Sequence, residues 1–378
     1  MPERLLLAHA RGQVLFIAGA GVSMPAGLPS FRKLVVDVYG KLDTAVHTVI
    51  TTSNDDEPGD VATLTNQQIA EVRRFKRRDY DVVLGMLERR MDDVPSGTSR
   101  VRATISEVLR STRGKPAPIH RALMRLSDRG GTAAIVTTNF DGLLQAGTPG
   151  KGKPQTYALG GIPRPGRGRD FAGVLHIHGA LDSNARRSAD FVVTDQDFGE
   201  FYMRRRIVPD FIYDAARLFH LVLVGYSADD PPMRYLLNAI AADGVRFEDL
   251  KERFTFVGSE RPDPVLVEDW KGRGITPIAY QNDDNHQALL SLLERWADFS
   301  AINGSPRKID AAIKRIVKTP RNSASEPDRD LFDHFFRRSN MVERTRLSDL
   351  ASRSGAELGW LDAIASVISE RQGEVAGP

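Results

Sequence analysis

Short apolar runs recur along the first three quarters of the chain, with helix-length segments between them. Each run is continuous rather than alternating, which predicts strands buried on both faces of a parallel sheet. The six runs are residues 14–18, 133–136, 174–177, 221–224, 254–257 and 276–279. This pattern predicts an α/β fold with a Rossmann-like, doubly wound parallel sheet.

Helical spacing replaces the strand pattern in two other parts of the chain. Residues 33–113 contain no strong strand run, and we expect a mostly helical insertion there. The pattern changes again near residue 300, after which helical segments predict a small C-terminal helical appendage. We therefore expect a nucleotide-binding catalytic domain over residues 1–300 and an appendage over 301–378. Residues 147–169 are rich in Gly, Pro and basic residues and predict a long loop on the ligand-facing side.

Composition removes several kinds of chemistry from consideration. The chain of 378 residues contains no cysteine, which excludes disulfides, thiolate catalysis and Cys-ligated zinc. Its net charge is only +3, and basic runs at 73–78, 204–206 and 307–321 are best interpreted as solvated helix faces or subunit contacts. Direct nucleic-acid binding is therefore not expected. No stretch approaches the roughly 20 apolar residues that span a bilayer, and we expect a cytoplasmic protein.

The segment that follows the first apolar run has the character of a phosphate-binding turn. Residues 19–32 read Gly-Ala-Gly-Val-Ser-Met-Pro-Ala-Gly-Leu-Pro-Ser-Phe-Arg. Gly19 and Gly21 allow the backbone to approach a ligand closely, and free amides there could face a diphosphate. The sequence therefore predicts a nucleotide site at the end of the first strand.

Polar residues also follow the next two runs. Asn139 and Asp141 come after the second, where an amide and a carboxylate could reach one ligand or simply cap the next helix. His178 and Gly179 come after the third, with His176 two residues earlier on the same strand face. A histidine at a strand end is more often structural than catalytic. Two histidines without a third ligand are also weak evidence for a metal.

The fourth and fifth runs end in small residues as well. Gly225 and Ser227 follow one, in a turn that suits ribose or phosphate but also suits the start of a helix. Gly258 and Glu260 follow the other, where a carboxylate could accept ribose hydroxyls or cap a helix. Ligands of open α/β sheets bind at the carboxyl ends of the strands, so the convergence of these residues matters more than any one of them.

At this point the motifs resemble those of the sirtuin family. Residues 19–32 are similar to its glycine–alanine–glycine, glycine–isoleucine–proline and phenylalanine–arginine pattern, with Leu28 in place of the isoleucine. Residues 137–141 resemble its threonine–glutamine–asparagine–isoleucine–aspartate element. His178-Gly179 resembles its catalytic histidine–glycine, and residues 225–227 its glycine–threonine–serine. Residues 115–120 are similar to the segment before its second core strand, where the histidine is structural.

Two departures from the family pattern carry information. Sirtuin deacylases use a Cys-ligated zinc module, which a chain without cysteine cannot build. Ser30 replaces the aspartate that usually precedes the phenylalanine–arginine pair. Both departures look like the sirtuin-like proteins of prokaryotic antiphage defence, many of which hydrolyse NAD. The resemblance therefore implies an NAD glycohydrolase that releases nicotinamide and ADP-ribose, with NAD as substrate and no zinc.

The resemblance also implies roles for particular residues. Asn139 would orient the ribose or the attacking water, His178 would act as a general base with a pKa near working pH, and Asp141 would contact the nicotinamide carboxamide. Amides of the glycine turn would hold the diphosphate, and the serine and glutamate after the fourth and fifth strands would lie on the adenosine side. The expected cofactor contacts are Gly19, Ala20, Gly21, Val22, Ser23, Arg32, Thr138, Gly225, Ser227, Gly258 and Glu260.

Three other functions are weighed against this interpretation. A dehydrogenase fingerprint would need a third glycine where Met24 stands. A protein deacylase would share the NAD site but would need an acyl-lysine cleft. A non-catalytic subunit that binds NAD or ADP-ribose is disfavoured because Asn139 and His178 are both present.

Partners follow from the resemblance alone. Because defence NADases can kill their host, the family implies gated activity, homo-oligomers and a partner such as a HerA-like ATPase, a short Argonaute or a phage-sensing module.

Overall fold

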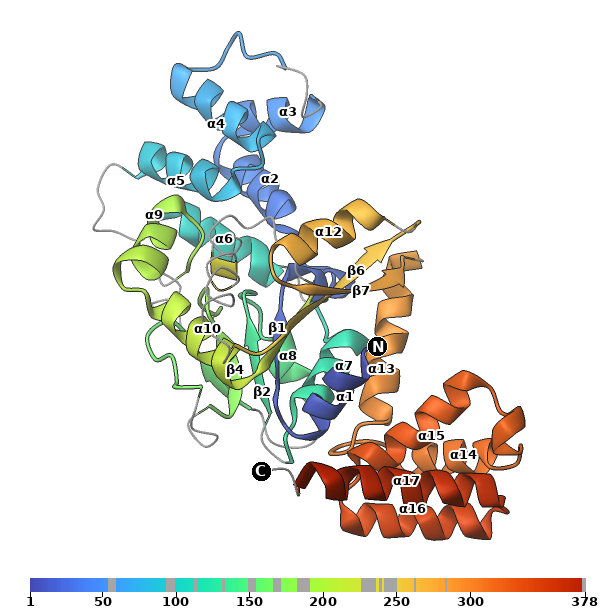
Figure 1. The fold of residues 1–378 in the computed structure, drawn as a ribbon. Coiled ribbons are helices and arrows are strands. Elements are labelled where there is room, and N and C mark those ends of the chain that lie inside the picture. Colours follow the sequence, from blue (N-terminus) through green and yellow to red (C-terminus); the bar gives the residue numbers. More distant parts are fainter. Residues whose placement is uncertain are drawn as a thin grey trace.

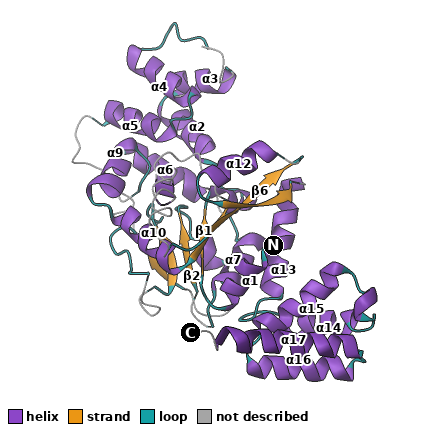
Figure 2. Ribbon diagram, in the orientation of Figure 1, coloured by secondary structure: helices purple, strands orange, loops and turns teal. Residues whose placement is uncertain are grey.

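Seven parallel strands form one sheet at the centre of the protein, in the order β3-β4-β2-β1-β5-β6-β7 (Figure 1; Figure 2). The computed structural model describes residues 1–53, 59–92, 99–111, 114–130, 133–148, 154–165, 171–181, 191–225, 236–237, 240, 250–261, 263–282 and 284–375. The strands are β1 (Val14–Ala18), β2 (Ala134–Thr137), β3 (Gln155–Tyr157), β4 (Gly173–His176), β5 (His220–Val224), β6 (Arg253–Ser259) and β7 (Thr276–Gln281). The predicted Rossmann-like α/β fold is confirmed.

The strand order reverses beside the central strand. β1 pairs with β2 on one side and with β5 on the other, with Phe16 opposite Ile135 and Val222. The chain fills the β2 side of the sheet first, and then crosses to β5, β6 and β7. The topological switch point therefore lies between β1 and β5, and open α/β sheets bind ligands at the carboxyl ends of the strands there.

One strand lies where a loop was predicted. Residues 155–157 of the predicted loop 147–169 form β3, the edge strand that pairs with β4. Its Gln-Thr-Tyr sequence is short and largely exposed, so no apolar run signals it. Residues 149–153 and 166–170 of the same stretch lie outside the described residues.

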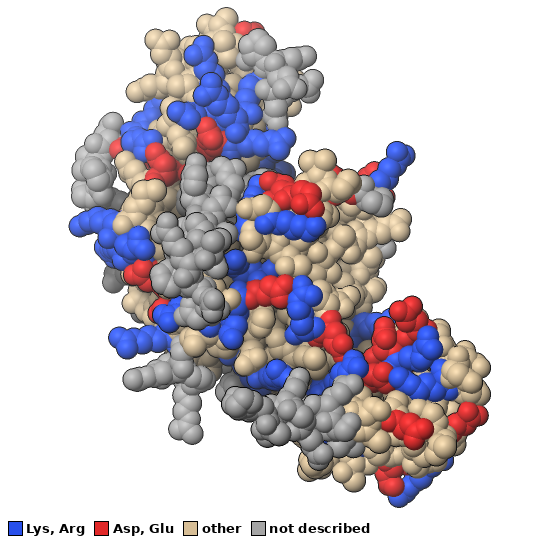
Figure 3. Space-filling view, viewed as in Figure 1, with Lys and Arg blue, Asp and Glu red and all other residues tan. Residues whose placement is uncertain are grey.

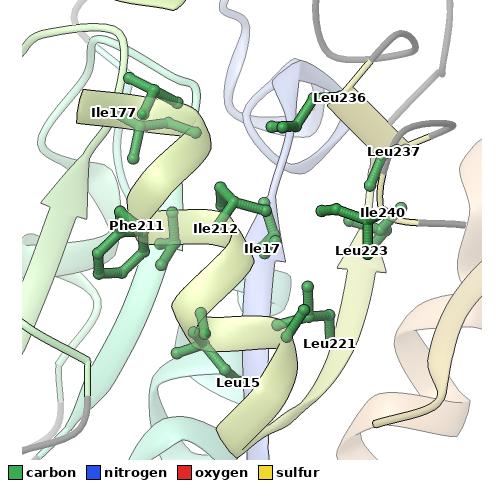
Figure 4. Packing of buried hydrophobic residues seen from close by; sticks show 14 of the residues in the cluster. Leu15, Ile17, Ile177, Phe211, Ile212, Leu221, Leu223, Leu236, Leu237 and Ile240 are labelled. Atoms are coloured by element: carbon green, nitrogen blue, oxygen red, sulfur yellow. The ribbon is translucent and has the colours of Figure 1, made fainter. Parts of the chain in front are cut away.

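Helices cover both faces of the sheet. Helix α10 (Ile207–Leu218) places Phe211 and Ile212 over β1 and β5 (Figure 4). Helices α1 (Glu3–Ala10), α7 (Pro118–Ser127) and α13 (Gln287–Asp298) pack on the opposite face, against Phe16 and Val222. Neighbouring residues of a strand point to opposite faces, so an unbroken apolar strand serves both layers.

The predicted insertion is a helical subdomain that lies beyond one end of the sheet (Figure 1). It has its own hydrophobic core, in which Tyr39, Phe75 and Leu84 are fully or almost fully buried. Phe191 and Val193, which precede helix α9 (Asp195–Phe198) in the chain, join the same core. Its helices are α2 (Phe31–Leu42), α3 (Thr44–Thr52), α4 (Asn66–Lys76), α5 (Tyr80–Met91) and α6 (Arg100–Ser111).

The predicted C-terminal appendage is also helical. Phe332, Phe336 and Trp360 are fully buried in a core separate from that of the sheet. Asp298 at the end of α13 bonds Arg125 on one side and Lys308 on the other, which ties the appendage to the sheet domain. The appendage helices are α14 (Pro306–Ile316), α15 (Glu326–Arg338), α16 (Met341–Arg353) and α17 (Leu358–Val375).

The basic runs lie on helix surfaces. Lys and Arg side chains gather over the helical insertion in Figure 3, where Arg73, Arg77 and Arg78 are exposed. Arg204 and Arg205 both pair with Glu200 on their own segment. In the part of the chain that the structure describes, no helix combines the length and the apolar character needed to cross a membrane.

Candidate active site

The loops that follow β1 and β5 touch each other through their backbones. The amide of Gly21 donates to the carbonyl of Gly225 at 2.8 Å, and the amide of Gly19 donates to Val224 at 2.9 Å. Gly225 has φ +62°, and a Cβ there would lie 2.5 Å from the backbone nitrogen of Val22. Only glycine fits this position, because any side chain would push the two strand ends apart.

Fewer backbone amides of the glycine turn are available to a diphosphate than the sequence predicted. The amide of Gly19 donates to the last residue of β5, that of Gly21 donates to Gly225 just after it, and that of Val22 donates to the carbonyl of Gly19 at 3.0 Å. Among the described hydrogen bonds, the amide of Ala20 has no acceptor, and the residue is exposed. Most of the amides over residues 19–22 therefore stabilise the turn itself and are not free to bind a diphosphate.

Ser23 connects three polar residues at this edge of the sheet. Its hydroxyl donates to Oδ2 of Asp141 at 2.8 Å and accepts from Nδ2 of Asn139 at 3.0 Å. Nε2 of His120 lies 3.3 Å from the same oxygen. Ser23 is 3% exposed, and its hydroxyl capacity is used within the protein. Ser23 thus organises the site, and its expected contact with the cofactor stays a prediction.

The orientation of Asn139 follows from its partners. Its Nδ2 donates to the carbonyl of Gly19 as well as to Ser23, each at 3.0 Å. A carbonyl can only accept, so the amide nitrogen must lie on this side. The side-chain oxygen of Asn139 is therefore the end left to accept a hydrogen bond from a ligand.

Asp141 bonds the start of the next helix, and its predicted contact with a ligand stays a prediction. Oδ1 accepts from the amide of Leu143 at 2.9 Å, at the start of the short helix α8 (Leu143–Ala146). Oδ2 accepts from Ser23. Each carboxylate oxygen can accept a second hydrogen bond, so the same group can cap the helix and contact a ligand.

His120 belongs to the site, although its sequence context indicated only a structural residue. It is fully buried, and its Nδ1 accepts from the amide of Ala117 at 3.1 Å. Nε2 must then carry the proton and donate to Ser23. Burial lowers the pKa of His120, and Asp141 opposes that effect. A neutral His120 therefore supports the serine hydroxyl from behind.

His176 holds the second strand end in place. Its Nδ1 lies 2.7 Å from the carbonyl of Asn139, which fixes Nδ1 as a donor. Its Nε2 then accepts from Gln145 at 2.7 Å. The residue is fully buried, and burial lowers its pKa. His176 is thus a neutral structural residue that positions the backbone of Asn139.

His178 is enclosed by aromatic side chains. Its Nε2 lies 2.6 Å from the hydroxyl of Tyr202, and the ring of Phe198 meets it edge-on with centroids 5.6 Å apart. His178 is 5% exposed, and burial lowers its pKa to about 3. This corrects the expectation of a pKa near working pH, since an imidazole away from water resists protonation. Tyr202 carries no motif, and no signal in the sequence pointed to it.

Hydrogen bonds between loops bring His178 to the same edge as Asn139. Two bonds join the segment that contains His178 to the segment after β2. His176, before His178 in the chain, bonds the carbonyl of Asn139, and the amide of Leu181, after His178, donates to the carbonyl of Phe140 at 2.7 Å. Hydrogen bonds therefore connect the segment after β5 to that after β1, the segment after β1 to that after β2, and the segment after β2 to that after β4.

The described hydrogen bonds around Ser23 do not include the remaining expected cofactor contacts. The guanidinium of Arg32 lies 5.0 Å from the ring centroid of Phe75 in the insertion. Thr138 donates its amide to Ala18. Gly258 lies within β6, where a Cβ would come within 2.6 Å of the ring of Tyr280, so packing alone explains this glycine. Glu260 is exposed, and Ser227 lies outside the described residues.

The described residues contain no group of three or more His, Asp or Glu side chains placed to hold a metal ion.

A comparison with known families matches the part of the chain that contains Asn139, Asp141 and His178. Residues 133–278 match the family model described as SIR2-like domain. The SIR2-like match runs from the start of β2 into β7 and includes Asn139, Asp141 and His178. The glycine turn after β1 lies outside it, and joins the site through the hydrogen bonds of Ser23 and Gly21.

The chain also resembles a longer protein. It is 32% identical over 97% of its length to "Uncharacterized protein y4cA" of Sinorhizobium fredii (strain NBRC 101917 / NGR234), and spans 29% of that protein.

Solved structures with similar folds include a Sir2 enzyme (TM-score 0.37, 78% of this chain and 96% of that chain). They also include a mutant Sir2 homologue with ADP ribose (0.36, 79% and 96%) and a Sir2 homologue with NAD (0.32, 78% and 94%), each at 15% identity.

Proposed function

We propose that this protein hydrolyses NAD to nicotinamide and ADP-ribose. The observation that carries the proposal is the network in which Ser23 holds both Asn139 and Asp141, at the switch point of a sheet whose sequence matches the SIR2-like domain. The backbone contact between Gly21 and Gly225 supports a nucleotide there in a different way, because it holds the loops after β1 and β5 together at the switch point, where open α/β sheets bind ligands.

The reaction itself asks for little covalent chemistry from the protein. The bond between C1′ of the ribose and the nicotinamide ring nitrogen breaks, and the bonding electrons neutralise the charge of that ring. A water oxygen then bonds to C1′ and releases a proton. The transition state resembles an oxocarbenium ion, as in other glycosyl cleavages. The protein therefore has to orient the ribose and the water and to accept a hydrogen bond from them.

The site residues divide this work between them. The oxygen of Asn139 accepts from the ribose or from the water, since both hydrogens of its amide are already engaged. Asp141 contacts the carboxamide of nicotinamide while Ser23 holds it. His178 supplies a neutral imidazole for the proton of a ribose hydroxyl or of water. The amide of Ala20 contacts the diphosphate, because Ala20 is exposed and its amide has no acceptor among the described hydrogen bonds.

Purified protein incubated with NAD tests the proposal, with nicotinamide and ADP-ribose separated by chromatography. Asn139→Ala and His178→Ala should each lower turnover roughly 10²- to 10⁴-fold. Asn322→Ala, an exposed asparagine in the appendage, serves as the matched control. Thermal unfolding of each variant shows whether it is folded. Unchanged turnover in both site variants would contradict the assignment.

A second assay with NAD and an acylated peptide tests the alternative function. If O-acyl-ADP-ribose is the main product, the protein is a deacylase and the proposed hydrolase function is wrong.

We further propose that NAD depletion serves antiphage defence and that a partner or self-assembly gates it. The defence role rests on the resemblance of the motifs, and the gating is suggested by the longer relative, in which the matching segment stands beside a much larger remainder. Turnover measured against protein concentration, together with mass determination in solution, tests the gating. A monomer that is fully active without any other component would count against it.

A further inference from the structure

The hydroxyl of Tyr202 and the imidazole of His178 form a buried pair that no motif indicates. Oη and Nε2 are 2.6 Å apart, and the two residues are 6% and 5% exposed. Phe198 stacks at an angle on Tyr202, with ring centroids 5.4 Å apart. The pair is therefore sealed by an aromatic wall, where a hydrogen bond is stronger than it is in water.

Tyr202 is held by regular structure rather than by a free loop. The short helix α9 (Asp195–Phe198) continues into the π-helix η4 (Gly199–Arg204), which carries Tyr202. A π-helix is rare and is often found at functional sites. Phe198 and Tyr202 are four residues apart along this segment, so both rings reach His178 from the same side.

The start of this segment is fastened to the helical insertion. Both Nη2 contacts of Arg102 with the carboxylate of Asp197 are shorter than 3.0 Å, and Arg102 also donates to the carbonyl of Phe191. Asp197 in turn accepts from the amide and hydroxyl of Thr194, the N-cap residue of α9. Tyr202 therefore has a fixed position relative to His178.

We propose that Tyr202 is a positioning residue for His178, a role that rests on the proposed hydrolase function. A neutral imidazole has one donor and one acceptor nitrogen. Nε2 is engaged by Tyr202, so Nδ1 is the nitrogen that remains for a ribose hydroxyl or water. For Nδ1 to accept a proton, the ring must carry its hydrogen on Nε2 and donate it to the tyrosine oxygen. Tyr202 thus sets the tautomer and the ring angle, as the third group of a catalytic triad does for its histidine.

Tyr202→Phe tests this role, because it removes the hydroxyl and keeps the ring against Phe198. We expect kcat for NAD to fall at least about 10-fold with KM little changed, since substrate binding does not use the hydroxyl. Tyr39→Phe is the matched control, because Tyr39 is fully buried and donates to Glu71 at 2.8 Å within the insertion. Its loss of a buried hydrogen bond should leave kcat unchanged. Turnover of Tyr202→Phe equal to or above that of the parent would overturn the proposal.

Nitrogen NMR of ¹⁵N-histidine-labelled protein gives a second readout that a merely structural role would not move. The parent should show His178 with its hydrogen on Nε2, assigned by the loss of that signal in His178→Ala, and Tyr202→Phe should show a mixture of tautomers. Hydrogen on Nδ1 in the parent would overturn the proposal. Tyr202 would then donate to Nε2, and Nδ1 could not accept a proton from a ribose hydroxyl or water. If the parent does not cleave NAD, the proposed function fails, while the spectra still decide the role of Tyr202.

Discussion

Gly21 and Gly225 meet backbone to backbone at the switch point of the sheet, with the amide of one donating to the carbonyl of the other at 2.8 Å. A Cβ on Gly21 would lie 3.0 Å from Gly225, and a Cβ on Gly225 would come still closer to the turn. This contact sets the distance between the loops after β1 and β5. The shape of the proposed nucleotide site therefore depends on two missing side chains.

Gly225→Ala should reduce both stability and ligand affinity. The left-handed backbone alone costs an alanine about 1–2 kcal/mol, and the new methyl group also collides with the backbone of Val22. Gly12→Ala is the control, because Gly12 has φ +72° with nothing within 4 Å of a Cβ. Urea unfolding and calorimetric titration with ADP-ribose should show a stability loss in both variants, but weaker binding only in Gly225→Ala. Equal binding by the two would mean that the glycine contact does not shape the site.

Ser23→Ala should damage the site more than it damages the fold. It leaves Asn139, Asp141 and His120 without their shared partner, and a lost buried hydrogen bond of this kind costs about 1–3 kcal/mol. We expect NAD turnover to fall well beyond what that loss of stability explains, because Asn139 and Asp141 lose the shared partner that orients their side chains, and Asn139 keeps only its bond to the carbonyl of Gly19. Ser325→Ala removes the N-cap of α15 in the appendage, with a comparable cost of about 1 kcal/mol. The control should retain full turnover, and a Ser23→Ala protein as active as this control would refute the role given to the network.

Arg102→Ala should destabilise the protein strongly. Its side chain is 15% exposed and bridges Glu88 and Asp197, so the variant leaves two carboxylates poorly compensated. Removing one partner of a buried ion pair costs about 3–5 kcal/mol. Arg315→Ala breaks the exposed pair with Asp328 and should cost about 0–1 kcal/mol. Denaturant midpoints compare the two directly. Similar midpoints would show that α9 does not depend on this link to the insertion.

Sequence patterns predicted those parts of the fold that bury apolar side chains. β1 is visible because all five of its residues are buried between helices, whereas β3 is exposed at the edge of the sheet and leaves no apolar run. The helices of the insertion and of the appendage were visible for the same reason, since each subdomain has an apolar core of its own.

The site divides along a similar line. Asn139 and Asp141 follow a strand end, so a motif can reveal them, and His178 follows the next. Their supporting partners come from elsewhere in the chain. Tyr202 reaches His178 from 24 residues away, and His120 reaches Ser23 from 97 residues away. Tertiary packing alone decides which buried hydroxyl or imidazole completes a network, and it also decides that the pKa of His178 falls rather than staying near neutrality.

The pH dependence of NAD hydrolysis should reflect the buried state of His178. Its pKa is lowered from 6.5 to about 3, so the imidazole stays neutral as the pH falls from 8 to 5, and it would be protonated only near pH 3. Because kcat/KM reports ionisations of the free enzyme, its profile should show no loss from His178 across that range. An ordinary exposed histidine would instead produce a fall as the pH drops through about 6.5. Initial rates at low NAD concentration, in buffers of constant ionic strength, measure the profile. A midpoint near 6.5 that disappears in His178→Gln would show that the histidine is exposed in the working enzyme.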